Sequence, residues 1–191
     1  MKRSVFCCGL IVGLIIGVAG VEALHGQGAG RAAPKDEFLD KLVGEWEYKG
    51  KIATQAGDAK FTATETVEWV CQEQFLLSRM TQISETGNRS FDILTLTRAE
   101  PGTGKIRQWV FESHGMAETA EGSRDGDTFV TESDGPAGKT RTKYEISDDG
   151  TLKIKVDGMA PPHKDWTPFV EMEGKRVDEG EKEAGGEEEG K

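Results

Sequence analysis

The chain has 191 residues, of which 36% are hydrophobic and 30% charged, and its formal net charge at pH 7 is −10. This length suits one domain with tails, and the 25 glycines are typical of many turns between short strands. The acidic balance argues against nucleic acid as a partner, because phosphate backbones are bound by lysine and arginine.

Residues 1–23 have the pattern of a targeting segment. A positive start at Lys2 and Arg3 precedes a long apolar run, and a small-residue site for a signal peptidase ends at Ala23. The alternative is an uncleaved membrane anchor, for which the run is short beside the roughly 20 residues of a full span. We therefore expect an exported protein of the periplasm, cell envelope or medium, which contacts a membrane only if this segment is retained.

The composition then separates a folded part from two polar or flexible segments. Residues 24–35 are small and glycine-rich, which predicts a flexible linker. Residues 178–191 hold seven acids and two bases with almost no apolar side chain, which predicts a disordered tail. The folded domain is expected at 36–177, and its single cysteine, Cys71, excludes an internal disulfide.

The folded part begins with a short amphipathic segment, Asp36 to Val43, which predicts a helix before Gly44 and Trp46. From Gly44 onward the apolar residues recur with period two, which indicates strands. Ten strands are predicted, at Glu45–Thr54, Lys60–Val70, Phe75–Ser84, Ser90–Arg98, Lys105–Glu112, Met116–Gly122, Thr128–Ser133, Thr140–Ser147, Thr151–Asp157 and Thr167–Gly174. Glycine, asparagine and aspartate between them are typical of hairpin turns.

Consecutive hairpins describe an up-and-down antiparallel meander, and closure of about ten strands into a β-barrel removes the exposed edges. The predicted fold class is therefore all-β, with a short N-terminal helix. We expect Trp46 to close one end of this barrel and the helix to cover it.

Three motifs in this order carry a family resemblance: Leu42-Val43-Gly44-Glu45-Trp46, then Thr64-Glu65-Thr66-Val67-Glu68-Trp69-Val70, then Gln74-Phe75-Leu76-Leu77. They resemble the bacterial lipocalin-like family called domain of unknown function 1579, over about Phe38 to Val177. The resemblance implies a calycin-type barrel and, often, export. It implies no catalytic residue, because the family has no established general function.

Two charged residues on neighbouring strands are predicted to point inward. Glu65 shares a face with Val67, and Arg79 shares a face with Leu77. The pair is either a polar anchor for a ligand or a structural ion pair that satisfies two buried charges. Trp46, Trp69, Trp109 and Trp166 are lining candidates, although aromatics at strand period are also typical of a core. The candidate ligand-binding residues are Trp46, Tyr48, Glu65, Trp69, Arg79 and Trp109.

The histidines give weaker signals. His114 shares a strand face with Glu112, but two ligands do not make a metal site. His163, on a loop after Pro161-Pro162, could hold haem as in ten-stranded nitrobindin-type barrels, an argument by analogy alone. We predict no metal ion and no cofactor.

The leading interpretation is an exported barrel that binds a small, partly apolar molecule. The alternative is a filled barrel that serves as a structural or interaction module of the envelope, and a haem-binding barrel is the third. An enzyme is the least supported class, since no nucleophile or phosphate motif is present, and no catalytic residue is predicted. The oligomeric state is left open.

Overall fold

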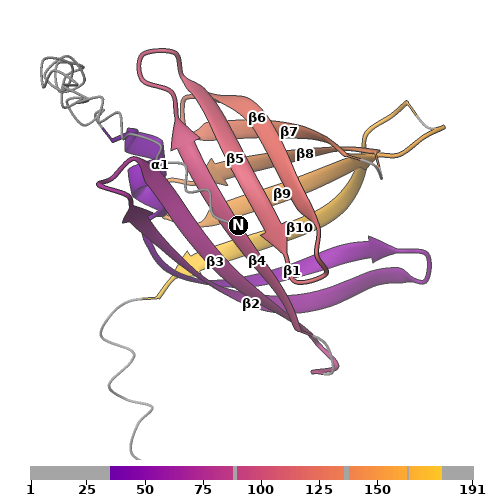
Figure 1. Cartoon of the computed structure of the whole chain (residues 1–191). Coiled ribbons are helices and arrows are strands. Elements are labelled where there is room, and N and C mark those ends of the chain that lie inside the picture. The colour runs from indigo at the N-terminus through magenta and orange to yellow at the C-terminus, as the bar shows by residue number, and fades with distance from the viewer. Residues whose placement is uncertain (1–34, 88–89, 136–137, 163, 178–191) are drawn as a thin grey trace, which may run out of the picture. The chain divides into compact units, whose positions relative to one another are not determined.

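The computed structural model describes residues 35–87, 90–135, 138–162 and 164–177, which form one helix and ten antiparallel strands (Figure 1). The elements are α1 (Glu37–Leu42), β1 (Gly44–Thr54), β2 (Gly57–Val70), β3 (Phe75–Ser84), β4 (Ser90–Ala99), β5 (Lys105–Glu112), β6 (Ala117–Asp125), β7 (Thr128–Gly135), β8 (Gly138–Ile146), β9 (Leu152–Met159) and β10 (Thr167–Arg176). Each strand pairs with the next, and β10 pairs with β1, so the sheet closes. The predicted all-β, ten-stranded antiparallel barrel is confirmed.

The register of the ladders fixes which side chains point inward. Tyr48 lies opposite Ala63, which lies opposite Gln82, and residues directly opposite share one face of the sheet. The most deeply buried side chains follow this inward face around the barrel: Trp46, Tyr48, Phe61, Ala63, Val67, Leu76, Met80, Ile106, Phe129, Leu152 and Ile154. No helix within the described residues is long and apolar enough to cross a membrane.

One end of the barrel is closed by α1. The Asp36 carboxylate caps the helix, accepting hydrogen bonds from the backbone N–H groups of Phe38 and Leu39 at 3.0 and 3.1 Å. The helix then ends against Trp46, whose indole Nε1 donates to the carbonyl of Leu42 at 2.8 Å. Trp46 is only 2% exposed, so its predicted role in closing this end is confirmed.

Polar contacts hold α1 to the turns at this end. Lys41 Nζ lies 2.8 Å from Asp127, in the turn between β6 and β7, and Arg124 Nη1 lies 3.1 Å from Asp36. Exposed ion pairs contribute little individually. The main attachment of the helix is therefore the apolar face formed by Phe38, Leu39 and Leu42, all buried.

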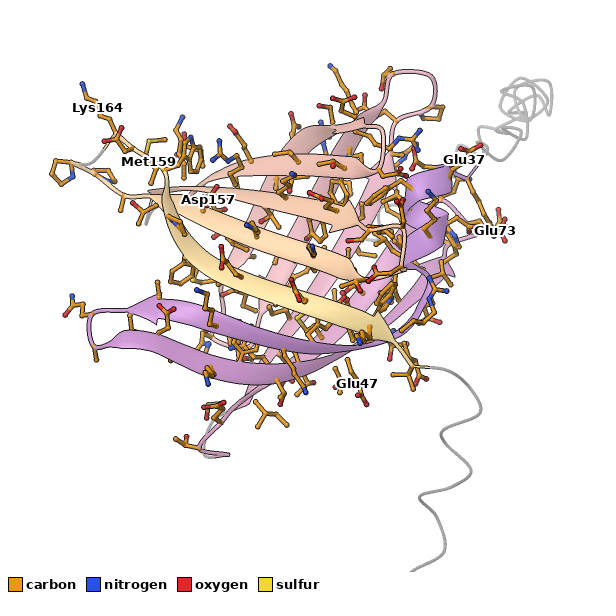
Figure 2. All side chains as sticks on the ribbon, turned by 180° about the vertical axis from the view of Figure 1, so that it is seen from behind. Glu37, Glu47, Glu73, Asp157, Met159 and Lys164 are labelled. Carbon is orange, nitrogen blue, oxygen red and sulfur yellow. The ribbon has the colours of Figure 1, made fainter. Side chains whose placement is uncertain are left out.

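The opposite end, where the β1–β2, β3–β4, β5–β6 and β7–β8 hairpins turn, is more open. Figure 2 labels Glu37 and Glu73 at the α1 end and Met159 and Lys164 at this other end. Phe61 and Met80 are buried on this side, but several other inward-facing apolar side chains keep partial exposure: Ile52, Phe91, Ile93, Val110, Val156, Val170 and Met172. Solvent therefore reaches the interior from the end opposite α1, which we call the mouth.

Two glycines allow the interior aromatics to lie against the barrel wall. Gly174 on β10 faces Tyr48 on β1, and a Cβ at Gly174 would lie 2.3 Å from Cε1 of the tyrosine ring. Gly50 has the same relation to Phe61, with a distance of 2.4 Å from a Cβ to Cζ. Both positions therefore exclude a side chain, and Tyr48 takes the position from which its hydroxyl reaches the middle of the interior.

Candidate functional site

The carboxyl group of Glu65 lies in the barrel interior, where it contacts side chains of the two neighbouring strands. Glu65 on β2 receives hydrogen bonds from the hydroxyl of Tyr48 on β1 and from the hydroxyl of Ser78 on β3. Neither donor is directly opposite Glu65; each is diagonal to it in the ladder, a distance that long side chains can reach. The network therefore joins β1, β2 and β3 through one acidic side chain.

The carboxyl group of Glu65 has hydrogen-bond donors around it but no positively charged partner among the described residues. Burial raises the pKa of Glu65 above its usual value of 4.5, and the hydrogen bonds from Ser78 and Tyr48 oppose the shift. Burial also raises the pKa of Tyr48 well above its usual value, and the charge of Glu65 adds to that shift. No lysine or arginine among the described residues lies within ion-pair distance of Glu65. Its ionised form is consequently an uncompensated charge inside the barrel.

Glu65 borders an interior cavity of about 40 Å³. One water needs roughly 10–15 Å³, so the cavity has room for about three or four. Its lining includes polar residues, Glu65, Ser78, Thr95, Thr97, Gln108 and Tyr144, and apolar residues, Leu42, Val67, Leu76, Phe129, Leu152 and Ile154. Such a mixed lining suits a group that has both a polar and an apolar part.

The far wall of the cavity is a second hydrogen-bonded cluster. The amide of Gln108 donates to Thr97 Oγ1 at 3.2 Å, and Thr131 Oγ1 donates to Gln108 Oε1 at 2.9 Å. Tyr144 stacks on Phe129 with 4.1 Å between ring centroids, and burial raises its pKa to about 12. The wall is therefore held in place by bonds between its own residues.

Two further acids face inward closer to the mouth. Glu118 on β6 lies opposite Val110 on β5, and Val110 is two residues before Glu112. The carboxylate of Glu118 accepts a hydrogen bond from the hydroxyl of Ser133 at 2.7 Å. Burial raises the pKa of Glu112; the Glu118 charge acts in the same direction, and His114 opposes it. Among the described residues, no group of three or more His, Cys, Asp and Glu side chains could hold a metal ion.

The predicted pairing of Glu65 with Arg79 is wrong. Arg79 lies opposite Thr66 and points outward, where its Nη1 is 2.6 Å from Glu68 and its side chain is 55% exposed. Both faces of β3 are apolar near its start, so the alternation of this strand alone did not fix its orientation. The partners of Glu65 are instead the hydroxyls of Tyr48 and Ser78.

The predicted tryptophans take different positions. Trp46 lies in the interior next to Tyr48, with 6.5 Å between ring centroids, while Trp69 is half-buried and donates to Asp40 at 2.8 Å. Trp109 lies on the outward face against Phe75, so its predicted place in the interior lining is wrong. Trp166 lies against the guanidinium group of Arg141, 4.6 Å from it. His163 lies outside the described residues.

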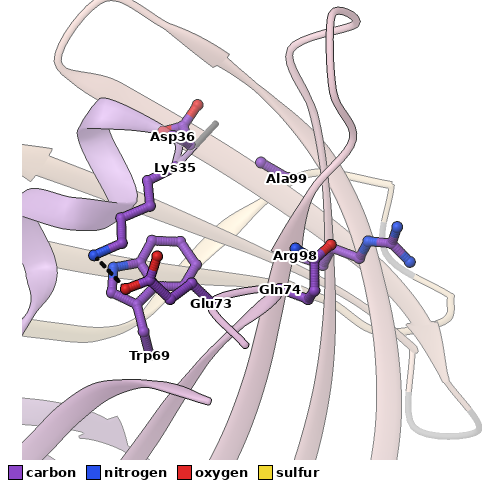
Figure 3. Close-up of a pocket in the computed structure, with 7 residues that line it drawn as sticks. All are labelled: Lys35, Asp36, Trp69, Glu73, Gln74, Arg98 and Ala99. Carbon is purple, nitrogen blue, oxygen red and sulfur yellow. Dashed lines mark ion pairs between the residues drawn. The ribbon is translucent and has the colours of Figure 1, made fainter. Parts of the chain in front are cut away.

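A second, smaller hollow of about 20 Å³ lies where α1 meets the turn between β2 and β3 (Figure 3). Lys35 reaches over Trp69 to pair with Glu73 at 3.1 Å, and Glu73 belongs to three successive residues with positive φ, from Cys71 to Glu73. Lys35, Trp69 and Glu73 of this hollow already contact one another. The interior cavity beside Glu65 is therefore the stronger candidate for a functional site.

Sequence reasoning did not identify five of the polar lining residues: Ser78, Thr95, Thr97, Gln108 and Tyr144. Their common signal is a polar side chain at a position that the register turns inward, such as Gln108 between Ile106 and Val110. That signal becomes readable only once the orientation of each strand is known.

Residues 31–176 match the family described as Protein of unknown function (DUF1579), and the chain belongs to this family. No curated protein matches the chain. Two solved structures are similar: Rv2717c from M. tuberculosis, with 14% identity, 75% of this chain and 99% of that chain covered and a TM-score of 0.60, and the S-type phycobiliprotein lyase CPES from Guillardia theta, with 11% identity, 74% and 92% covered and a TM-score of 0.58. At these identities the likeness concerns the barrel fold alone.

Proposed function

We propose that this barrel binds a small, partly apolar molecule in its interior. The observation that carries the proposal is the cavity bordered by the buried carboxyl group of Glu65, inside a barrel with partly exposed inward-facing side chains toward the end opposite α1. A barrel that served only to fill itself would be more stable with apolar groups there, because burying a charge without a counter-charge costs free energy. The likeness of the fold to that of a phycobiliprotein lyase is in keeping with a ligand-binding barrel.

The arrangement suggests how such a molecule would lie. Its polar end would reach Glu65 and the hydroxyl groups around it, while its apolar part would contact the partly exposed side chains toward the mouth, such as Ile93, Val110 and Met172. The cavity is small, so only a slender end of the molecule fits beside Glu65 without movement of the wall.

The second candidate function is a filled barrel that acts as a structural or interaction module. It is favoured by the cavity volume of about 40 Å³, far below the several hundred cubic ångströms of ordinary ligand pockets. It is also favoured by the hydrogen bonds of the interior, since every buried side-chain nitrogen and oxygen of the described residues has a partner.

A dye titration separates the two candidates. Parinaryl alcohol is a neutral, unbranched polyene dye whose fluorescence rises in an apolar site, and we expect a saturable rise with the wild-type protein. Thr95→Leu puts a larger side chain into the cavity and should weaken binding at least tenfold, while Thr64→Leu, on the outward face of β2, should bind like the wild type. No saturable rise with the wild type, or equal binding by Thr95→Leu, would contradict an interior site.

We also propose that the protein is exported, on the evidence of the positive start and apolar run in residues 1–23. Fractionation of cells that express the full chain tests this. The domain should appear outside the cytoplasm, and recovery in the cytoplasmic fraction alone would contradict export.

A further inference from the structure

The inward-facing charges of the barrel are unevenly distributed. In the described strands, the positions that the register turns inward carry five charged side chains: Glu65, Glu112, Glu118, Arg124 and Arg176. The two arginines come from strand ends beside α1, and the three glutamates come from positions between α1 and the mouth. The interior is therefore acidic along the path by which a ligand would enter.

Neither arginine compensates these glutamates, because each is engaged with the helix end of the barrel. Arg124 pairs with Asp36 at 3.1 Å, and Arg176 donates to the carbonyl of Lys41 at 2.5 Å while its guanidinium group lies over the ring of Trp46. On the mouth side of α1 the described inward face holds no lysine or arginine. The negative charge of the interior is thus left for a ligand to balance.

We propose that the ligand of this barrel is a primary amine with an unbranched apolar chain, whose ammonium group binds beside Glu65. The inference rests on the proposed function and adds to it the chemical class of the ligand. Opposite charges attract strongly in a site with little water, and the charges of Glu112 and Glu118 near the mouth would draw a cation inward.

The cavity suits an ammonium group in size and in bonding. A volume of about 40 Å³ accepts a terminal –NH₃⁺ with the first carbon atoms of its chain, but no ring. The ammonium group donates three hydrogen bonds and accepts none. The lining offers acceptor oxygens on Glu65, Ser78 and Thr95 within one small space. The apolar part of the lining would contact the first methylene groups.

Other ligand classes fit this interior less well. A fatty acid or another anionic amphiphile would bring a like charge toward three glutamates, which is unfavourable. A metal ion lacks the required ligand geometry among the described residues, since no three potential ligands come together. An organic cation balances the negative charge of the glutamates and does not need three ligands arranged around it.

A set of three probes with the same chain length tests the ligand class: decylamine, decanol and decanoate, titrated calorimetrically at pH 7.5 below their aggregation concentrations. We expect decylamine to bind at least tenfold more tightly than decanol, and decanoate to bind most weakly. If decanol or decanoate binds as tightly as decylamine, the inference is overturned while an interior site for apolar molecules stands. If none of the three binds and the neutral dye also fails, the proposed function fails with it.

Substitution of the proposed anchor is the second arm. Glu65→Gln should reduce decylamine affinity about tenfold and leave decanol affinity within twofold, so that the preference for the amine is lost. Glu68→Gln is the matched control, because Glu68 lies on the same strand but points outward and pairs with Arg79. An unchanged amine preference in Glu65→Gln, or an equal loss in Glu68→Gln, would contradict the assignment of Glu65. If Glu65→Gln does not fold, the wild-type order of the three affinities decides the question alone.

Discussion

Replacement of Tyr48 by phenylalanine isolates the hydrogen bond that Glu65 receives inside the barrel. The ring is 1% exposed and lies against Gly174, and phenylalanine keeps that packing while removing the hydroxyl. A hydrogen bond to a charged group contributes about 1.5–3 kcal/mol, against about 0.5–1.5 kcal/mol for a neutral pair. We therefore expect Tyr48→Phe to lower the free energy of unfolding by about 2 kcal/mol at a pH above the folded-state pKa of Glu65.

The same substitution in a Glu65→Gln background gives the contribution of the charge. Glutamine keeps an acceptor for the tyrosine hydroxyl, so the loss should fall to about 1 kcal/mol, and the double-mutant cycle should show a coupling of about 1 kcal/mol. Urea unfolding followed by tryptophan fluorescence measures these values. In a thermal scan, 2 kcal/mol corresponds to a shift of about 4–8 °C for a domain of this size.

Tyr144→Phe is the control, since its hydroxyl is near the neutral amide of Gln108. It should cost about 0.5–1.5 kcal/mol in both backgrounds. A loss below about 0.5 kcal/mol for Tyr48→Phe, below the range for even a neutral hydrogen bond, would refute the reasoning, as would an equal loss with and without the Glu65 charge.

Three further predictions concern the packing and titration of the same interior. Trp46→Ala should lower the free energy of unfolding, measured in urea, by about 3–5 kcal/mol. The substitution removes a buried indole ring and its hydrogen bond to the carbonyl of Leu42. A loss under about 1 kcal/mol would show that α1 and Trp46 do not close the barrel. Gly174→Val should lower the free energy of unfolding by about 1–3 kcal/mol, measured the same way, because its Cβ would clash with the ring of Tyr48. The double variant with Tyr48→Ala should relieve this clash. An unchanged stability of Gly174→Val would contradict the close approach of the ring to the backbone. Because burial raises the folded-state pKa of Glu65 above 4.5, the folded form holds its proton more tightly than the unfolded form. Stability should therefore fall as the pH rises from about 4.5 through the folded pKa, and Glu65→Gln should lack this part of the slope; identical pH profiles would contradict the buried carboxyl group.

The strands of this fold were predictable because their apolar alternation and turn residues are local signals. The predicted ranges Phe75–Ser84 and Lys105–Glu112 match β3 and β5 at both ends, and the predicted helix at Asp36 to Val43 differs from α1 by one residue at each end. Closure of the barrel was also predictable, since ten strands in consecutive hairpins leave two edges that closure pairs with each other.

The orientation of the side chains was less predictable, and the candidate site depends on it. Trp109 lies in a run of apolar residues with Val110 and Phe111, so alternation does not say which of them faces inward. The pairing with β4 determines it. Inward-facing Thr97 lies opposite Gln108, so Gln108 faces inward and Trp109 faces outward. A one-residue change of pairing reverses every side chain of a strand, and this pairing is set by the neighbouring strand, not by local sequence.

The central claim is that a ligand binds inside the barrel beside Glu65, and nuclear magnetic resonance of the isotope-labelled protein titrated with decylamine tests it most directly. The account predicts shifts at the inward-facing Glu65, Ser78 and Thr95, with the outward-facing Thr66 and Arg79 on the same strands unmoved. Shifts confined to the outward face, or no shifts at saturating decylamine, would contradict it.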